Sequence, residues 1–348
     1  MPHLFSRHPL LLQTAFSELK RQASEQSFVL VGTPGSVGTR AVNGRQFLYR
    51  QFYDAEGKKA AQYIGSAEDR QAALHAEAIG AQIMLTRALV KDARLLTERG
   101  YVRTDARTNA IVAVLSNRGL FRAGAVLVGS HAYGALLNDL GVRASAFATE
   151  DVDIARGDRL ELALAEGDDF ATMLADSTVP LSPVPGFDRK TPTTSYKAPG
   201  KSRLRVDLLV PSTSGEVSTR PVPELGAHAT ALPHLRYLLK GAYEAVLLGR
   251  EGILPVRVPR PEAFAWHKML VSQLRTATRE KRAKDILQAA VLFAVLAEDA
   301  PDALEAAFAA VPRMARTATR SGARLVLAQL SKTNHERASE LMQELTRA

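Results

Sequence analysis

Three aspartates occupy positions from which they could share metal ions. Asp151 and Asp153 are one residue apart, and Asp207 lies within the apolar run of residues 205–210. Alternate residues of a strand face the same side, so the first two carboxylates are expected to project together. Neighbouring carboxylates repel one another, and a hard divalent cation with oxygen ligands relieves that repulsion. Two such cations, Mg²⁺ or Mn²⁺, can drive transfer of a nucleotide from a triphosphate.

An ion-pair interpretation competes with this metal site. Charged residues inside apolar strands are seldom left without a partner. Arg156 or Arg205 could pair with an aspartate at the end of a strand. For one aspartate alone, the ion pair is the simpler interpretation. Three aspartates together, with Gly129 and Ser130 upstream, favour the metal site.

Gly129 and Ser130 are expected between a strand and a helix, because an apolar stretch at 125–128 precedes them and a helical pattern at 132–140 follows. Backbone N–H groups at a helix start can bind phosphate oxygens, aided by the helix dipole. Glycine allows close approach, and the serine hydroxyl can also donate. A lone Gly-Ser pair most often marks only a turn. Phosphate binding is favoured here because this pair precedes the two aspartates in the sequence. His131 is a further candidate for this site.

The surrounding pattern predicts the elements that would position these residues. Strands at 150–155 and 204–210 would carry the aspartates, and the proline-rich segment 176–200 would be mostly loop. After Pro259 the chain is expected to be helical. The other predicted elements are helices at 9–24, 67–99 and 105–120, a hairpin with strands at 46–53 and 60–64, and strands at 243–248 and 253–258.

With these motifs together, the chain resembles the nucleotidyltransferase superfamily typified by DNA polymerase β. Members of that superfamily have an apolar residue, Gly, Gly or Ser, a helix, Asp-x-Asp, and a third carboxylate on a later strand. The segment between the Gly-Ser pair and Asp-x-Asp is longer here than in compact members, which is expected to reshape the pocket. The matching residues are Val128-Gly129-Ser130, Asp151-Val152-Asp153 and Asp207.

The chain is more closely similar to a bacterial group of nucleotidyltransferase-like proteins of about this length. That group carries Gly-Ser/Thr-His-Ala ahead of Asp-x-Asp, an N-terminal hairpin ending in Tyr-x-Gly, and a His-Lys followed by a Lys-Asp. More distantly, the chain resembles the toxins of type IV abortive-infection systems. The matching residues are Gly129-Ser130-His131-Ala132, Tyr63-Ile64-Gly65, His267-Lys268 and Lys284-Asp285.

The resemblance implies a metal-dependent nucleotidyltransferase that moves a nucleoside monophosphate from an NTP to a hydroxyl acceptor. Asp151 and Asp153 would bind both ions. Asp207 would bind the catalytic ion and help to deprotonate the acceptor. The acceptor could be RNA, with tRNA expected in a toxin-like role, or else a protein hydroxyl or a small molecule. An antitoxin-like protein would then be a partner.

The resemblance also implies which residues bind the nucleotide. Gly129 and Ser130 would hold the β- and γ-phosphates, with Lys268 in support. Arg275 falls on the same helix face as Lys268, and Asp285 would orient Lys268 or a sugar hydroxyl. The alternative is an exposed basic face, with Asp285 as a favourable charge near a helix N-terminus.

The predicted fold is α/β (α+β). It has a nucleotidyltransferase mixed sheet with flanking helices, an N-terminal β-hairpin and helical region, and a C-terminal helical bundle. The predicted domains are residues 1–100 with the first helix, the hairpin and the long helix, residues 101–260 with the nucleotidyltransferase core, and residues 261–348 with the C-terminal helices.

The formal net charge of +9 suits a polyanionic partner such as RNA, DNA or a triphosphate. Basic residues gather at 257–284, and four arginines follow at helical spacing: Arg313, Arg316, Arg320 and Arg324. Such a basic surface can follow a phosphate backbone. The alternative function is therefore a non-catalytic nucleic-acid-binding protein that retains the nucleotidyltransferase fold.

Composition and segment length exclude several classes of protein. The chain contains no cysteine, so disulfides and thiolate metal sites are excluded. No basic start leads into an apolar core as in a signal peptide, and the apolar stretch from Ile286 to Ala297 is too short to span a bilayer. A cytoplasmic location without a membrane partner is expected. The glycine-rich segment 32–38 lacks the Gly-Lys-Ser/Thr ending of a phosphate loop and is expected to be a flexible turn.

Overall fold

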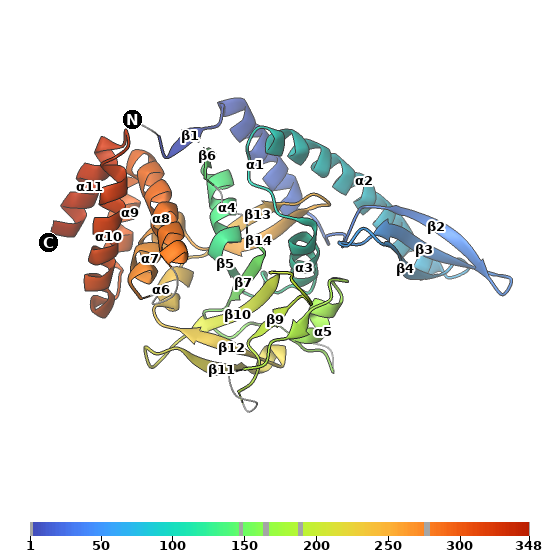
Figure 1. The fold of residues 1–348 in the computed structure, drawn as a ribbon. Coiled ribbons are helices and arrows are strands. Elements are labelled where there is room, and N and C mark those ends of the chain that lie inside the picture. Colours follow the sequence, from blue (N-terminus) through green and yellow to red (C-terminus); the bar gives the residue numbers. More distant parts are fainter. Residues whose placement is uncertain (1–2, 146–148, 163–166, 187–190, 275–278, 348) are drawn as a thin grey trace.

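The computed structural model describes residues 3–145, 149–162, 167–186, 191–274 and 279–347. Three regions follow one another across the molecule (Figure 1): an N-terminal region with a projecting three-stranded sheet, a central mixed sheet, and a C-terminal group of helices. This arrangement is the α+β fold that the sequence predicts. The predicted boundary near 100 falls between α2 and α3, and that near 260 falls between β14 and α7.

The N-terminal helices pack against a hairpin that comes from the middle of the chain. Phe16 and Leu89 share an apolar core with Val246 and Ile253 of that hairpin. The predicted strands at 243–248 and 253–258 are thereby confirmed. The elements of this part are β1 (Phe5–Arg7), α1 (Leu10–Ser24), α2 (Arg70–Glu98), β13 (Tyr243–Leu248) and β14 (Ile253–Val258).

The hairpin expected near the N-terminus is confirmed, and a third strand extends it to an antiparallel sheet. Its strands are β2 (Ser36–Val42), β3 (Arg45–Tyr53) and β4 (Lys59–Ser66), in the order β2-β3-β4. The expectation of a flexible turn over residues 32–38 is therefore wrong for its last residues, which begin β2. At Gly35, which has a φ of +66°, an added Cβ would overlap the backbone of Gln51 in β3. A glycine is required there for the chain to enter the sheet.

The central sheet is mixed, and its main strand order is β11-β12-β10-β7-β5. Strand β10 runs parallel to β7 and β12, whereas β5 runs antiparallel to β7. The proline-rich segment expected to be mostly loop contributes β8 and β9, and β9 pairs antiparallel with the start of β10. The strands are β5 (Val126–Val128), β7 (Asp151–Ala155), β8 (Ser182–Pro183), β9 (Ser195–Lys197), β10 (Arg205–Pro211), β11 (Ser218–Val222) and β12 (Ala227–Leu232).

Helices α3 and α4 cover the central sheet, and their side chains fill the largest core. The amide of Asn138 in α4 accepts a hydrogen bond from the backbone N–H of Val102 (2.7 Å) and donates one to the Val102 carbonyl (2.9 Å). These two bonds hold the segment before α3 against α4. The elements are α3 (Ala106–Asn117), α4 (Gly129–Asp139), β6 (Val142–Ala144, paired with β1), α5 (Phe170–Ala175), the 3₁₀ helix Pro223–Leu225 and α6 (Leu235–Leu239).

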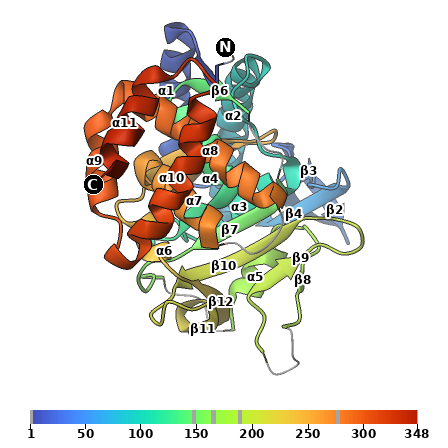
Figure 2. The same ribbon diagram turned by 60° about the vertical axis from the view of Figure 1, so that its left-hand side comes forward.

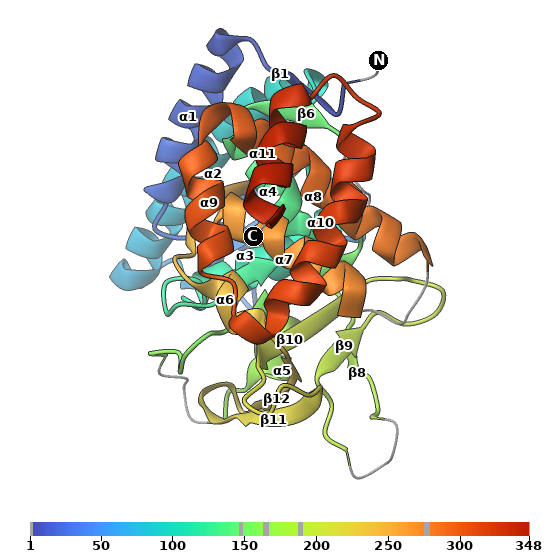
Figure 3. The same ribbon diagram turned by 90° about the vertical axis from the view of Figure 1, so that its left-hand side faces the viewer.

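The C-terminal helices form a bundle beside the central sheet, with β10 to β12 below it (Figures 2 and 3). Its core contains Trp266, whose indole N–H donates to the carbonyl of Leu304 (2.9 Å). Gly322 of α10 lies against Met269 of α7, where an added Cβ would overlap the backbone carbonyl. The elements are α7 (Pro261–Leu274), α8 (Arg279–Asp299), α9 (Pro301–Ala309), the 3₁₀ helix Arg313–Ala315, α10 (Arg316–Leu330) and α11 (Glu336–Arg347).

Two of the four arginines expected to form a basic surface at 313–324 make contacts within the bundle. The Arg316 side chain donates to the carbonyl of Ala309 (2.9 Å), and the Arg320 guanidinium lies 5.9 Å from the ring centre of Phe308. No helix within the described ranges combines the length and the apolar character needed to cross a membrane.

Candidate active site

The three aspartates lie on one face of two neighbouring strands. In the parallel pair of β7 and β10, Asp153 is the register partner of Asp207. Register partners on adjacent strands project to the same side, as does Asp151, two residues before Asp153. Val152 and Ile154 are fully buried on the opposite face. The structure therefore brings together the three carboxylates that the sequence singles out, and Asp207 is not on the far side of the sheet.

Electrostatic repulsion between these carboxylates is visible at Asp151. Burial raises the pKa of Asp151, and the negative charge of Asp207 raises it further. Nearby cations oppose this increase in the pKa, in the order Lys281, Arg205 and Lys284. A carboxylate that is destabilised in this way gains from a neighbouring positive charge.

Asp207 has partners from both its own strand and the adjacent strand β9. The hydroxyl of Ser195 donates to Asp207 Oδ1, and Arg205 Nε donates to the same oxygen (2.7 Å). Arg205 Nη2 also donates to the Ser195 hydroxyl (2.7 Å). The ion-pair interpretation thus holds for Asp207 and Arg205, whereas Arg156 pairs with Glu224 (3.2 Å). The Arg205 side chain is 45% exposed, so water weakens this pair.

The chemical character of the three carboxylates fits Mg²⁺ or Mn²⁺, which prefer oxygen ligands. Within the described residues, no three His, Cys, Asp or Glu side chains are already grouped as a metal-binding cluster. Both bonds to Asp207 use Oδ1. Neither bond involves Oδ2 of Asp207, the oxygen that could bind a cation without breaking them.

Gly129 brings the start of α4 directly against Asp153. Strand β5 ends at Val128, which is the register partner of Asp153, and α4 begins at the next residue. Gly129 has a φ of +70°, and an added Cβ would collide with Asp153 Oδ2. Only glycine fits both the left-handed backbone and the close approach. The N–H groups at the start of α4 therefore lie beside the carboxylates, as the sequence predicts.

A cavity of about 750 Å³ opens next to this junction. Its size is in the range of small-molecule binding pockets. Ser130, His131 and Asp151 line it. Its other charged lining residues are the cations Arg103, Arg107, Arg203 and Lys284 and the acids Asp105 and Glu150. With Asp151 included, four cations face three acids, so the lining can contact an anionic ligand and its cations.

His131 is buried in the wall of this cavity, and its Nε2 finds no hydrogen-bond partner among the described residues. Burial lowers the pKa of His131 to about 4, with Asp105 opposing and Lys284 assisting this shift. The imidazole is therefore neutral near pH 7. A neutral ring in this position can exchange hydrogen bonds with a ligand without adding charge.

We expect His131 to make the protein sensitive to mild acid. Its pKa is about 4 in the folded chain against an ordinary value of 6.5, so the unfolded state binds the proton first. Stability is therefore complete above pH 6.5 and falls as the pH drops towards 4. At pH 4.5, wild type should lose about 2.5 kcal/mol more of its unfolding free energy than His131→Leu. Urea denaturation at pH 7 and pH 4.5 measures this difference.

The exposed His75 on α2 supplies the control, as His75→Leu should keep the wild-type pH dependence. Equal losses in wild type and His131→Leu between pH 7 and pH 4.5 would show that His131 does not charge on unfolding.

Lys268 and Asp285 pair with each other inside the C-terminal bundle. Lys268 Nζ lies 2.6 Å from Asp285 Oδ1, and both residues are buried. The alternative of an exposed basic face is therefore wrong, because α7 turns this face towards α8 and α10. The proposed orientation of Lys268 by Asp285 agrees with this geometry. Lys268 is not part of the described cavity lining, so its role on a triphosphate stays a prediction, and Arg275 lies outside the described residues.

Lys284 lines the cavity, although no role was predicted for it from the sequence. Burial lowers the pKa of Lys284, and Lys268 lowers it further. Asp285, Asp151 and Asp153 act in the opposite direction. Its position directly before Asp285 in the Lys-Asp motif was the available signal. Arg103, Arg107 and Arg203 were also missed, because they lie at the ends of elements and share no periodic pattern.

Comparison with known proteins gives one family for this site. A family described as nucleotidyltransferase matches residues 106–312, more than half of the chain. The matched segment contains α3, α4, the three aspartates and Lys284. No curated protein and no solved structure matches the chain.

Proposed function

The chain belongs to a nucleotidyltransferase family, and from this premise we propose that it transfers a nucleoside monophosphate from a nucleoside triphosphate to a hydroxyl acceptor. The family supports nucleotidyl transfer in general. The observation that carries the finer proposal is the contact between Gly129 and Asp153, because it sets a phosphate-binding helix start beside three carboxylates. Donors for phosphate and ligands for cations are both needed within one site for this reaction.

The residues at the start of α4 would bind the triphosphate. The backbone N–H groups of Gly129 and Ser130 would donate to phosphate oxygens, with the Ser130 hydroxyl at the cavity wall. Lys284 would neutralise phosphate charge from the opposite element, α8. The neutral imidazole of His131 would bind a ligand group through Nε2. These groups would hold the triphosphate while the acceptor oxygen bonds to its α-phosphorus. The bond from the α-phosphorus to the bridging oxygen would break, and pyrophosphate would leave.

The aspartates would hold the metal ions for the reaction. Asp151, Asp153 and Asp207 would hold Mg²⁺ or Mn²⁺, which supplies charge neutralisation and activation of the attacking oxygen. Asp207 would accept the proton of the acceptor hydroxyl. Ser195 would keep the Asp207 carboxylate oriented while this happens.

The proposal is tested by incubation with each α-labelled nucleoside triphosphate, Mg²⁺ or Mn²⁺, and total cellular RNA. Label should move into an acceptor with one preferred triphosphate, and chelation by EDTA should prevent it. Separation of RNA, protein and small molecules then identifies the acceptor class. Failure of every triphosphate to label any of the three fractions would overturn the proposed transfer.

Lys284 should contribute to triphosphate affinity. Lys284→Met is expected to raise KM for the triphosphate by about 10-fold, because a hydrogen bond to a charged group contributes roughly 1.5–3 kcal/mol. The turnover rate should change less, since this contact exists before the reaction starts. Initial rates over a range of triphosphate concentrations measure both constants.

Lys332→Met removes an exposed lysine near the end of α10 and is the matched control for charge. The prediction would be wrong if Lys284→Met left KM for the triphosphate unchanged and Lys332→Met raised it. The triphosphate would then bind at a different surface.

A further inference from the structure

The three-stranded sheet of β2, β3 and β4 has one packed face and one open face. Val37 and Ile64 pack with Leu30, Ile79 and Ile83 beneath the sheet, against α2. Arg50 is also turned inwards, where it donates to three backbone carbonyls of the segment before β2. The opposite face points away from α2, and the β2–β3 end of the sheet projects from the molecule (Figure 1).

Aromatic rings line the open face. Phe47, Tyr49 and Tyr53 alternate along β3, and Tyr49 is the register partner of Tyr63 on β4. The ring centres of Tyr49 and Tyr63 are 5.5 Å apart, and those of Phe47 and Tyr63 are 6.0 Å apart. Tyr63 is 57% exposed. Large aromatic side chains are seldom grouped in water without a partner, and flat rings on a sheet offer stacking surfaces for bases.

The charge of this face complements a polyanion. The sequences of the three strands contain no Asp or Glu. Arg40, Arg45 and Lys59 are exposed on this face. Arg40 is the register partner of Phe47, and Lys59 is that of Tyr53. The Arg40 guanidinium lies 5.9 Å from the ring centre of Tyr49. Cations interleaved with aromatic rings match the alternation of phosphates and bases along a single strand.

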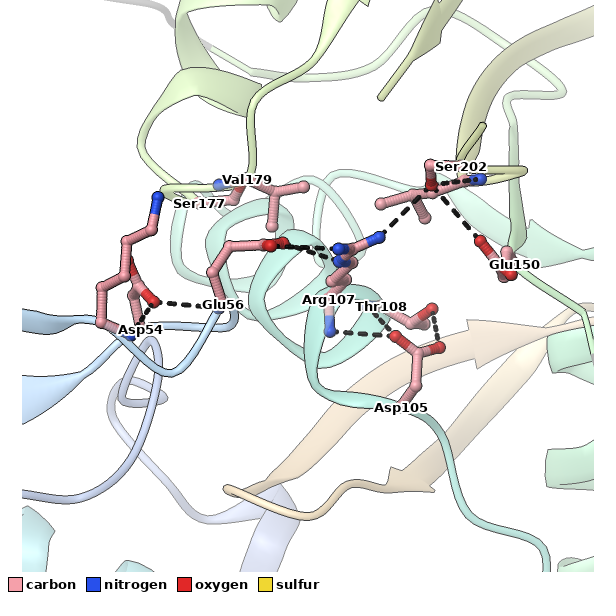
Figure 4. A network of polar contacts seen from close by, with 11 residues as sticks. Asp54, Glu56, Asp105, Arg107, Thr108, Glu150, Ser177, Val179 and Ser202 are labelled. Carbon is pink, nitrogen blue, oxygen red and sulfur yellow. Dashed lines mark hydrogen bonds and ion pairs between the residues drawn. The ribbon is translucent and has the colours of Figure 1, made fainter. Parts of the chain in front are cut away.

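The turn between β3 and β4 contacts α3 through Arg107 (Figure 4), and Arg107 lines the cavity. Glu56 in this turn forms an ion pair with Arg107 of α3 (2.6 Å), and Arg107 also donates to the Ser202 hydroxyl (3.3 Å). Ala55 of the same turn lines the cavity. The Asp54 carboxylate accepts hydrogen bonds from backbone N–H groups within the turn. The acids nearest to the open face are thereby used in contacts of the turn, and the face ends at the rim of the cavity.

We propose that the open face of this sheet binds a single-stranded nucleic acid. Its bases stack on Tyr49, Tyr63 and Phe47, and its phosphates contact Arg40, Arg45 and Lys59. The strand then runs towards the cavity, where its terminal hydroxyl is the acceptor. This last step rests on the proposed nucleotidyl transfer, whereas binding to the sheet does not.

The test is fluorescence anisotropy with a fluorescein-labelled 20-nucleotide RNA of mixed sequence, the DNA of the same sequence, and the duplex of each, without triphosphate or metal. We expect the protein to bind a single strand, RNA or DNA, more tightly than its duplex. The double variant Tyr49→Ala/Tyr63→Ala should weaken single-strand binding by about 30-fold, because each stacked base contributes substantially. Circular dichroism and thermal unfolding verify that the variant is folded.

Two further variants make the result specific. Tyr63→Leu keeps an apolar side chain on an edge strand and should still weaken binding, so it replaces the double variant if that chain does not fold. Arg40→Ala/Arg45→Ala should weaken binding and reduce its salt dependence. The matched pair Arg337→Ala/Arg347→Ala, at exposed positions of α11, should bind as wild type does.

The inference is overturned if neither single strand binds, or if folded Tyr63→Leu and Arg40→Ala/Arg45→Ala both bind as tightly as wild type. It is also overturned if duplexes bind as tightly as single strands. These outcomes are separate from the proposed function, because label transfer to a small acceptor would continue without the sheet. Conversely, single-strand binding that depends on the tyrosines would stand even if no triphosphate were consumed.

Discussion

Asp153→Asn is expected to reduce nucleotidyl transfer by about 1000-fold or more while the protein stays folded. Asp153 lies between Asp151 and Asp207 on one face and contacts the start of α4, so it is central to both halves of the site. Metal ions contribute several kcal/mol to stabilising charge in the transition state, and each 1.36 kcal/mol corresponds to tenfold in rate. Asparagine keeps the size of the side chain and removes its charge. Initial rates of label transfer measure the effect.

Binding of the metal can be measured separately from activity. Millimolar Mg²⁺ should raise the thermal unfolding midpoint of wild type, since a ligand that binds only the folded state stabilises it. Asp153→Asn should lack this increase. Asp158→Asn is the matched control, because the Asp158 side chain is 88% exposed and pairs with Arg236 at the surface. If Asp153→Asn transferred label at the wild-type rate, the three carboxylates would not be the catalytic metal ligands.

Gly129→Ala is expected to damage both stability and activity. The φ of +70° is unfavourable for alanine, and the new Cβ would collide with Asp153 Oδ2. The backbone strain alone costs about 1–3 kcal/mol of unfolding free energy. Displacement of the carboxylate by about 1 Å should lower transfer by roughly 100-fold. Urea denaturation and label-transfer rates measure the two effects.

Gly215→Ala is the control that measures the stability cost of backbone strain alone. Gly215 has a φ of +79°, but an added Cβ there meets no neighbouring atom. Its substitution should therefore lower stability without lowering transfer. If Gly129→Ala transfers label at the wild-type rate once its stability is taken into account, close contact with Asp153 has no part in the reaction.

Elements with a regular pattern could be predicted from the sequence. Strands β13 and β14 are confirmed at their predicted bounds, and β7 and β10 begin within one residue of the expected positions. Alternating apolar residues define such strands without knowledge of the neighbours. Strand β2 was missed because Gly35 directly precedes it and Gly38 interrupts its pattern. Its pairing with β3 is a tertiary contact that outweighs the low strand preference of glycine.

The candidate site was predictable where one strand dictates the geometry. The one-residue gap between Asp151 and Asp153 determines that they share a face, and the apolar run around Asp207 indicates an adjacent strand. The sequence alone could not predict which lysine lies at the cavity. Lys268 and Lys284 both lie in basic helical segments, and only the packing of α7 against α8 buries the first and leaves the second at the cavity.

The close crossing of α10 over α7 at Gly322 has a practical consequence for protein truncation. The family match ends at residue 312, before α10 begins. A fragment trimmed to that limit would uncover the backbone of Met269 and the apolar side chains that Val326 and Leu330 now cover. Aggregation of such a fragment would reflect this lost helix rather than a defect of its catalytic chemistry.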